Sequence, residues 1–153
     1  MLRMSRLTDY GTVVLAHLAS NGSSCVSAAE VAETSGIALP TVSKLLKALA
    51  KAELVTSTRG AHGGYCLARQ PQRISAAEVI DALEGPVSIT ECSASNSHCD
   101  YERNCNVGSA WQRINVAIRR ALDDISLADL QRAHSPVPSF KLGGIPINIG
   151  RKA

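Results

Sequence analysis

Three cysteines, Cys92, Cys99 and Cys105, lie close together in the second half of the chain. Six residues separate the first pair and five the second, a spacing that fits neither one face of a helix nor one face of a strand. A loop that carries three thiolates can wrap a metal ion or an iron–sulfur cluster, because these centres prefer soft sulfur ligands. The chain has five cysteines in all, and an odd number argues against a closed disulfide framework.

Two other kinds of chemistry remain open for this cysteine triplet. Zinc sites commonly use Cys-x-x-Cys pairs, and the sequence contains none. A thiol switch needs two cysteines close in space and a lowered pKa, which a sequence does not reveal. We expect Cys25, in a turn between helices, and Cys66, in a strand, to take no part. His98 is a weaker candidate ligand, because a residue adjacent to Cys99 points away from the ligand direction.

Apolar periodicity and capping signals predict the elements that position this segment. We expect a first helix over about residues 7–20. A second begins at the capping box Ser27–Glu30 and ends at Gly36, and a third begins at Pro40. The apolar stripe of the third helix is Val42, Leu45, Leu46 and Leu49.

The pattern then changes to that of a hairpin. Strands over about 54–58 and 65–68 flank a glycine-rich turn. A second capping box, Ser75–Glu78, opens a fourth helix that ends at Gly85. After the cysteines, a long amphipathic helix is expected, with one side formed by Trp111, Ile114, Ile118, Ala121 and Leu122. The fold class is therefore mainly α-helical with one small β-hairpin.

This order of elements is typical of a winged helix-turn-helix, in which the third helix enters the DNA major groove. Residues 38–73 carry six Lys and Arg against one acid, which suits phosphate contacts. The alternatives are a solvated basic surface and a plain helical bundle. Candidate DNA contacts are Pro40, Thr41, Ser43, Lys44 and Lys47 on the helix, and Arg59, Gly63 and Gly64 in the hairpin, or wing.

Other classes of protein are disfavoured. No apolar run approaches the roughly 18 residues of a membrane helix, and the first ten residues carry two Arg and one Asp, so a signal peptide is not expected. A cytoplasmic protein without a membrane partner is predicted. No phosphate-binding loop, nucleophile–base set or carboxylate pair indicates an enzyme, and no catalytic residue is assigned.

The segment Leu7–Tyr10, the wing motif Arg59–Tyr65 and the cysteine triplet together resemble the Rrf2 (Rrf-two) family of winged-helix transcriptional regulators. The resemblance covers about residues 1–132 and is strongest to iron–sulfur members of the IscR, NsrR and RirA types. The opening residues 1–11 look most similar to proteobacterial regulators of the Suf cluster-assembly system. The resemblance implies a homodimer on double-stranded operator DNA, with the long C-terminal helix as the dimerisation element.

It also implies a ligand set. Cys92, Cys99 and Cys105 would hold a cluster, with 4Fe–4S preferred and 2Fe–2S second. IscR-type relatives place a His three residues after the last Cys, where this chain has Gly108. NsrR-type relatives use an Asp of the other subunit, at the position of Asp9. The alternative for Asp9 is a carboxylate favoured by the helix dipole.

The predicted domains are a winged helix-turn-helix over 1–86, a cluster-binding loop over 87–106, a dimerisation-helix region over 107–132 and a disordered tail over 133–153. The predicted function is a cluster-sensing repressor of suf-type assembly genes, with assembly proteins as possible cluster donors. A thiol-redox or zinc-dependent regulator of the same fold is the alternative, and a cluster carrier without DNA binding is less favoured.

Overall fold

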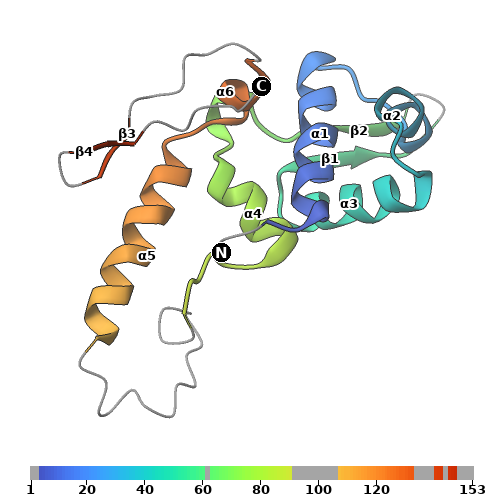
Figure 1. Ribbon diagram of the computed structural model, residues 1–153. Helices are drawn as coiled ribbons and strands as arrows, with labels where there is room; N and C mark the ends of the chain where they lie inside the picture. Colours follow the sequence, from blue (N-terminus) through green and yellow to red (C-terminus); the bar gives the residue numbers. More distant parts are fainter. Residues whose placement is uncertain (1–3, 61–62, 91–106, 133–139, 143–144, 148–153) are drawn as a thin grey trace.

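A computed structural model describes residues 4–60, 63–90, 107–132, 140–142 and 145–147 (Figure 1). The fold is mainly helical with a small antiparallel hairpin, as predicted. Cys92, Cys99 and Cys105 lie outside the described residues. The elements are α1 (Arg6–Ser20), α2 (Ala28–Ser35), α3 (Leu39–Lys51), β1 (Val55–Thr58), β2 (Gly64–Leu67), the 3-10 turn η1 (Pro71–Arg73), α4 (Ala76–Glu84), α5 (Gly108–Asp123), α6 (Leu127–Gln131), β3 (Phe140–Leu142) and β4 (Ile145–Ile147).

One aliphatic core lies between α1, α3 and α4. The predicted stripe of α3, from Val42 to Leu49, is buried, and α1 adds Val14, Leu15 and Leu18. Gly11 lies where α1 approaches α4, and a Cβ atom there would lie 2.3 Å from Leu83 Cδ1, so that side chain would have to move. The core therefore fixes the winged-helix part of the molecule.

The predicted helix ends are present, although at the start of α2 only the Ser27 half of the predicted capping box forms. Ser27 Oγ accepts a hydrogen bond from the Glu30 amide (3.1 Å) at the start of α2, and Gly36 ends α2 in the left-handed conformation, with φ of 70°. Ser75 and Glu78 form a complete capping box for α4. These local signals place the turn between α2 and α3, which sets the orientation of α3.

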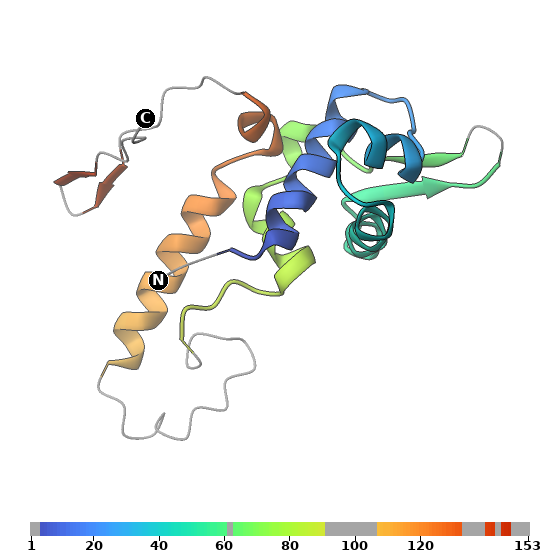
Figure 2. The same cartoon turned by 45° about the vertical axis from the view of Figure 1, so that its right-hand side comes forward.

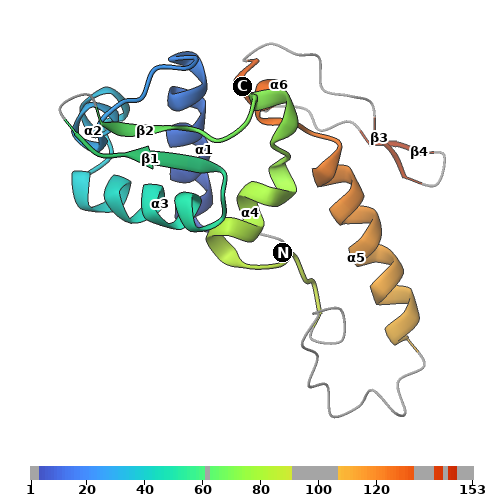
Figure 3. The same ribbon diagram turned by 180° about the vertical axis from the view of Figure 1, so that it is seen from behind.

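The wing consists of β1 and β2, paired from Val55↔Leu67 to Thr58↔Gly64. A third short segment joins it, because Val26, just before α2, pairs antiparallel with Tyr65. The wing lies alongside α3 (Figure 3). The wing is thus attached both to α3 and to the chain ahead of α2.

Helix α5 stands apart from the winged-helix core (Figures 1 and 2). None of its 16 residues is buried, and Trp111 and Ile114 are 39% and 43% exposed. The chain after α5 returns to the core, where Leu127 is fully buried and its amide donates to the Ile74 carbonyl (2.8 Å). Helix α5 is therefore anchored at its C-terminal end.

Part of the predicted disordered tail differs from expectation. The strands β3 and β4 pair antiparallel, with Phe140 opposite Ile147 and Leu142 opposite Ile145. These apolar residues alternate with Lys141 and Pro146, a period-two pattern typical of a strand. The correction concerns these two short strands, and the remainder of 133–153 lies outside the described residues.

Candidate nucleic-acid interface and cofactor-binding segment

Helix α3 presents a polar and basic surface opposite its buried stripe. Lys44 and Lys47 are exposed, as is Pro40 in the first turn, and Thr41 and Ser43 are half-buried. Lys51 extends the same basic row, because residues spaced three and four apart share a face of a helix. The five predicted residues of α3 therefore remain outside the core, and all but Lys47 lie in the N-terminal half of the helix.

The wing adds one exposed cation and a tight turn. Arg59 is exposed just after β1. A Cβ atom on Gly63 would lie 2.5 Å from the Thr58 carbonyl oxygen, and one on Gly64 would lie 2.6 Å from the Val26 carbonyl oxygen. Packing of the backbone in and beside the wing therefore favours glycine at both positions. This is a second reason for these glycines, besides the DNA contact predicted from the sequence.

Sequence reasoning missed Leu39, the first residue of α3. It is 46% exposed although it lies three residues before Val42, in phase with the buried stripe. An apolar side chain at the start of a recognition helix can contact a thymine methyl group. The signal available in the sequence was an apolar residue immediately before the helix-starting Pro40.

The cysteine segment begins where α4 is fixed to α1. At the end of α4, one carboxylate oxygen of Glu84 accepts hydrogen bonds from the Ser5 amide (2.9 Å) and from the Thr8 hydroxyl. The Thr8 hydroxyl and then the Ser5 amide lower the pKa of Glu84. Thr8 is buried, at 4% exposure. The residues that lead into the cysteines are therefore attached to the first turn of α1.

Two pockets surround this junction. One, of about 400 Å³, lies among Met4, the stretch from Glu84 to Ser88, and Ile118 and Leu122 of α5. The other, of about 510 Å³, is lined by α1, α4 and the end of α5, and its wall includes Asp9. The stretch that follows α4 thus lines one apolar pocket, and the first turns of α1 line the neighbouring one.

Asp9 is exposed in the first turn of α1. Within the part of the chain that the structure describes, its carboxylate makes no hydrogen bond or ion pair. It is placed where the helix dipole favours a carboxylate, and where an external positive centre can reach it. Thiolate sulfur and carboxylate oxygen are donor types that an iron–sulfur cluster accepts, and the three cysteines lie outside the described residues.

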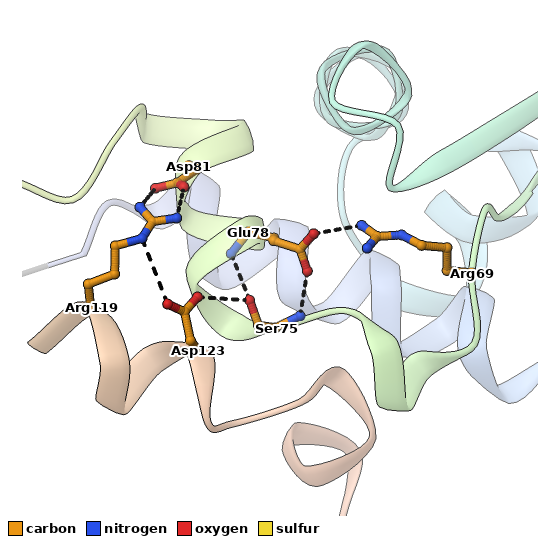
Figure 4. A network of polar contacts seen from close by, with 6 residues as sticks. All are labelled: Arg69, Ser75, Glu78, Asp81, Arg119 and Asp123. Carbon is orange, nitrogen blue, oxygen red and sulfur yellow. Dashed lines mark hydrogen bonds and ion pairs between the residues drawn. The ribbon is translucent and has the colours of Figure 1, made fainter. Parts of the chain in front are cut away.

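A polar network joins α4 to α5 and to the segment that follows β2 (Figure 4). Arg119 of α5 donates to both carboxylate oxygens of Asp81 on α4 (3.0 and 2.6 Å). Arg69, which follows β2, pairs with Glu78 of α4 (2.8 Å). Ser75 Oγ bridges the two groups by donating to Asp123 (3.4 Å) and accepting from the Glu78 amide. Helix α4 therefore connects the chain just after β2 to α5.

The two remaining cysteines lie on segments that pair through Val26 and Tyr65; that neither takes part in the cofactor site stays a prediction. The pKa of Cys25 is raised, first by a hydrogen bond with the Cys66 thiol and then by burial. The sequence did not show this pair, because 41 positions separate the two residues.

These elements define a winged helix-turn-helix protein: the short helix α2, the turn after it, the exposed basic helix α3 and the paired strands of the wing. Comparison with known families is more specific: residues 4–133 match the Rrf2 family, described as iron-dependent transcriptional regulators. The chain belongs to this family, whose named relatives are transcriptional regulators rather than enzymes.

Two curated relatives and one solved structure illustrate the similarity. The Rrf2 protein of Nitratidesulfovibrio vulgaris is 36% identical over 138 residues, 90% of this chain and 92% of the relative. The regulator IscR of Sodalis glossinidius is 35% identical over 129 residues, 82% and 78% of the two chains. The structure of CymR, described as the global cysteine regulator of B. subtilis, superposes with a TM-score of 0.67 at 32% identity, covering 88% of this chain and 100% of that one.

No helix among the described residues is both long and apolar enough to cross a membrane.

Proposed function

We propose that the protein is an iron–sulfur-cluster-sensing repressor that binds operator DNA as a homodimer and controls suf-type cluster-assembly genes. Regulation of transcription follows from the family; the cluster, the dimer and the target genes are the proposal. The observation that carries it is the place of the cysteine triplet in the sequence, between α4, which is paired with Arg69 just after β2, and α5, the exposed helix.

The ligands we assign are Cys92, Cys99 and Cys105, with the fourth position taken by Asp9 of a second copy. Asp9 lies on the surface of α1 and lines the groove beside α4 and the end of α5. When bound, the cluster supplies a site that reacts with oxygen, nitric oxide or chelators, since three thiolates and one carboxylate hold one iron weakly. A 4Fe–4S cluster is our first assignment and a 2Fe–2S cluster the second.

The dimer is supported by α5. A helix of 16 residues with no buried side chain gains little stability from its own subunit, because helices in proteins are held by packing of their apolar face. Trp111 and Ile114 are exposed on that face, so we assign them to the contact with the partner helix, and Ile118 to its edge.

Coupling between the cluster and DNA follows the polar network. The cysteine segment begins at the end of α4 and ends at the start of α5. Asp81–Arg119 transmits a shift of α5 to α4, and Glu78–Arg69 transmits it to the wing. Two recognition helices of a dimer must match half-sites about 34 Å apart, so a small change in their separation alters affinity.

The cluster is tested by the absorbance spectrum of anaerobically purified protein, with iron, sulfide and zinc measured on the same sample. We expect iron, sulfide and a broad visible band, all lost in Cys92→Ala, which should also repress poorly in iron-replete cells. Cys25→Ser is the matched control, because it removes a thiol outside the triplet. A colourless protein after anaerobic reconstitution, with zinc or no metal, would assign the triplet to zinc or thiol chemistry.

DNA binding is tested separately with Arg59→Ala. Because Arg59 lies in the exposed wing, its loss should weaken operator binding and leave the iron and sulfide content unchanged. Binding should fall steeply with salt, as expected when several phosphates are contacted. Loss of the cluster in Arg59→Ala, or binding that is insensitive to salt, would contradict this division of roles.

A further inference from the structure

Cys25 and Cys66 lie opposite each other on neighbouring extended segments. The Val26 amide donates to the Tyr65 carbonyl (3.0 Å), and the Tyr65 amide donates to the Val26 carbonyl (2.8 Å). A pair that exchanges both hydrogen bonds is followed in an antiparallel ladder by a non-hydrogen-bonded pair, with Cα atoms about 4.5 Å apart. Cys25 and Cys66 occupy that next pair, and this separation lies within the range that a disulfide spans.

The side chains around the pair are polar and accessible. The Cys66 Sγ atom lies 3.2 Å from Thr56 Oγ1, and a hydrogen bond from Thr58 acts on Cys25. Both cysteines are only partly buried, so a small reagent can reach them. The nearby Cys66 thiol is the first cause of the raised pKa of Cys25, in keeping with their positions on the paired segments.

We propose that Cys25 and Cys66 are an oxidisable dithiol, which hydrogen peroxide converts to a disulfide between the chain ahead of α2 and the wing strand β2. This site lies in the winged-helix part of the molecule and is separate from the triplet Cys92, Cys99 and Cys105. Nothing in the proposed cluster-sensing function requires it.

The reaction balances in two steps. The Cys66 thiolate attacks one oxygen of hydrogen peroxide, the O–O bond breaks, and a sulfenic acid and one water result once the leaving hydroxide takes up a proton. The Cys25 sulfur then attacks Cys66 Sγ, the S–O bond breaks, and the departing hydroxide takes the Cys25 proton as a second water. Two thiols are oxidised and one peroxide is reduced. We assign the first attack to Cys66 because Cys25, with its raised pKa, retains its proton more strongly.

The disulfide would join two segments that already pair through Val26 and Tyr65, so it requires no rearrangement of the backbone. It would close the connection between the helix-turn-helix and the wing that carries Arg59. Peroxide would thereby act on the DNA-facing part of the chain through a group independent of the cluster.

The test is peptide mapping of the full-length protein. Reduced protein is treated with stoichiometric hydrogen peroxide, alkylated without reductant, and digested with trypsin. Cleavage after Arg6, Lys44, Arg59 and Arg69 gives peptides 7–44 and 60–69, each with one cysteine, so a linked product identifies the bond. We expect loss of both alkylated peptides and gain of the linked pair, lighter by two hydrogen atoms and reversed by dithiothreitol.

Two variants complete the experiment. In Cys66→Ala, peptide 7–44 should remain alkylated at the same peroxide dose, and in Cys99→Ser the linked pair should still form. The proposal is overturned if Cys25 and Cys66 in the wild-type chain stay alkylatable, are oxidised singly to sulfinic acids, or are recovered linked to Cys92, Cys99 or Cys105. The wild-type measurement decides the matter even if a variant folds poorly.

Discussion

At the scale of single residues, Glu84 is the contact that fixes the start of the cysteine segment. Its carboxylate accepts from the buried Thr8 hydroxyl and from the Ser5 amide at the N-terminus of α1. A charged acceptor makes stronger hydrogen bonds than a neutral one, and this favours the ionised form of Glu84. The neighbour of Thr8 is Asp9, so this contact also orients the helix turn that carries the proposed fourth ligand.

The lowered pKa of Glu84 predicts a pH dependence of stability. A carboxyl whose pKa is lower in the folded than in the unfolded chain stabilises the fold above its unfolded value of about 4.3, and this contribution is lost as pH falls through the folded pKa. We therefore expect Glu84→Gln to flatten the decrease in the urea midpoint between pH 6 and pH 3. Thr8→Val should flatten it too, because it removes the principal donor. Parallel profiles for wild type and both variants would contradict this account.

At the scale of elements, α4 is the connection between α5 and the chain that leaves the wing after β2. Its two carboxylates, Glu78 and Asp81, pair with Arg69 and Arg119 on opposite sides (Figure 4). The Arg119–Asp81 pair is bidentate, and its side chains are 38% and 27% exposed. Partial exposure limits its contribution to stability to about 1 kcal/mol, so its larger effect is on the orientation of α5.

We expect Arg119→Gln to lower the unfolding free energy by about 1 kcal/mol or less and to reduce the difference in DNA affinity between the cluster-loaded and cluster-free protein. The measurement is operator titration of both forms, with urea unfolding on the same samples. Arg132→Gln is the matched control, because it removes a more exposed pair within α6 and its cap. An unchanged difference in affinity would show that α5 acts on DNA by another route.

At the scale of the whole molecule, the apolar face of α5 is the feature that a single chain leaves uncovered. The core of the winged-helix part is closed by α1, α3 and α4, whereas Val107, Trp111 and Ile114 are exposed beyond it. Contiguous exposed apolar side chains usually mark an interaction surface. In the proposed dimer, α5 of a second copy would cover this surface, and α3 of that copy would be the second recognition helix.

We therefore expect Ile114→Glu to convert the protein to a monomer in light scattering and to weaken operator binding at least tenfold. Arg120→Glu, which changes charge on the opposite side of the same helix, should remain dimeric. If Ile114→Glu stays dimeric, the apolar face of α5 is not the contact between subunits. A monomeric wild type would remove the dimer from the proposed function.

Much of the fold is predictable because its signals are local. The capping residues Ser27 and Ser75, the αL position of Gly36 and the buried stripe of α3 act within a few residues of themselves. The contacts that were not predicted from the sequence depend on packing between segments that are far apart along the chain. Cys25 meets Cys66 only because Val26 pairs with the wing, and Glu84 meets Thr8 only because α4 packs on α1.

In the candidate site, too, some features follow from local sequence signals and others only from the packing. The basic residues of α3 and the exposed Arg59 follow from helix phase and hairpin position, and the structure leaves them at the surface. Leu39 was missed because helix phase alone predicts burial, while the start of α3 extends past the core that would cover it. Periodicity identifies a face, and only the packing shows where that face ends.

The anchoring of α5 at its C-terminal end makes the helix a lever. Its base is held by the pairing of Ser75 with Ser126 and by the buried Leu127, while the cysteine segment joins the opposite end at Gly108. A 16-residue helix is about 24 Å long, so a tilt of about 5° at the pivot moves the tip by roughly 2 Å. Conversely, for a force applied at the tip, the moment arm about the pivot is the full length of α5. A group bound at that end would therefore tilt α5 more, for the same force, than a group bound near the pivot.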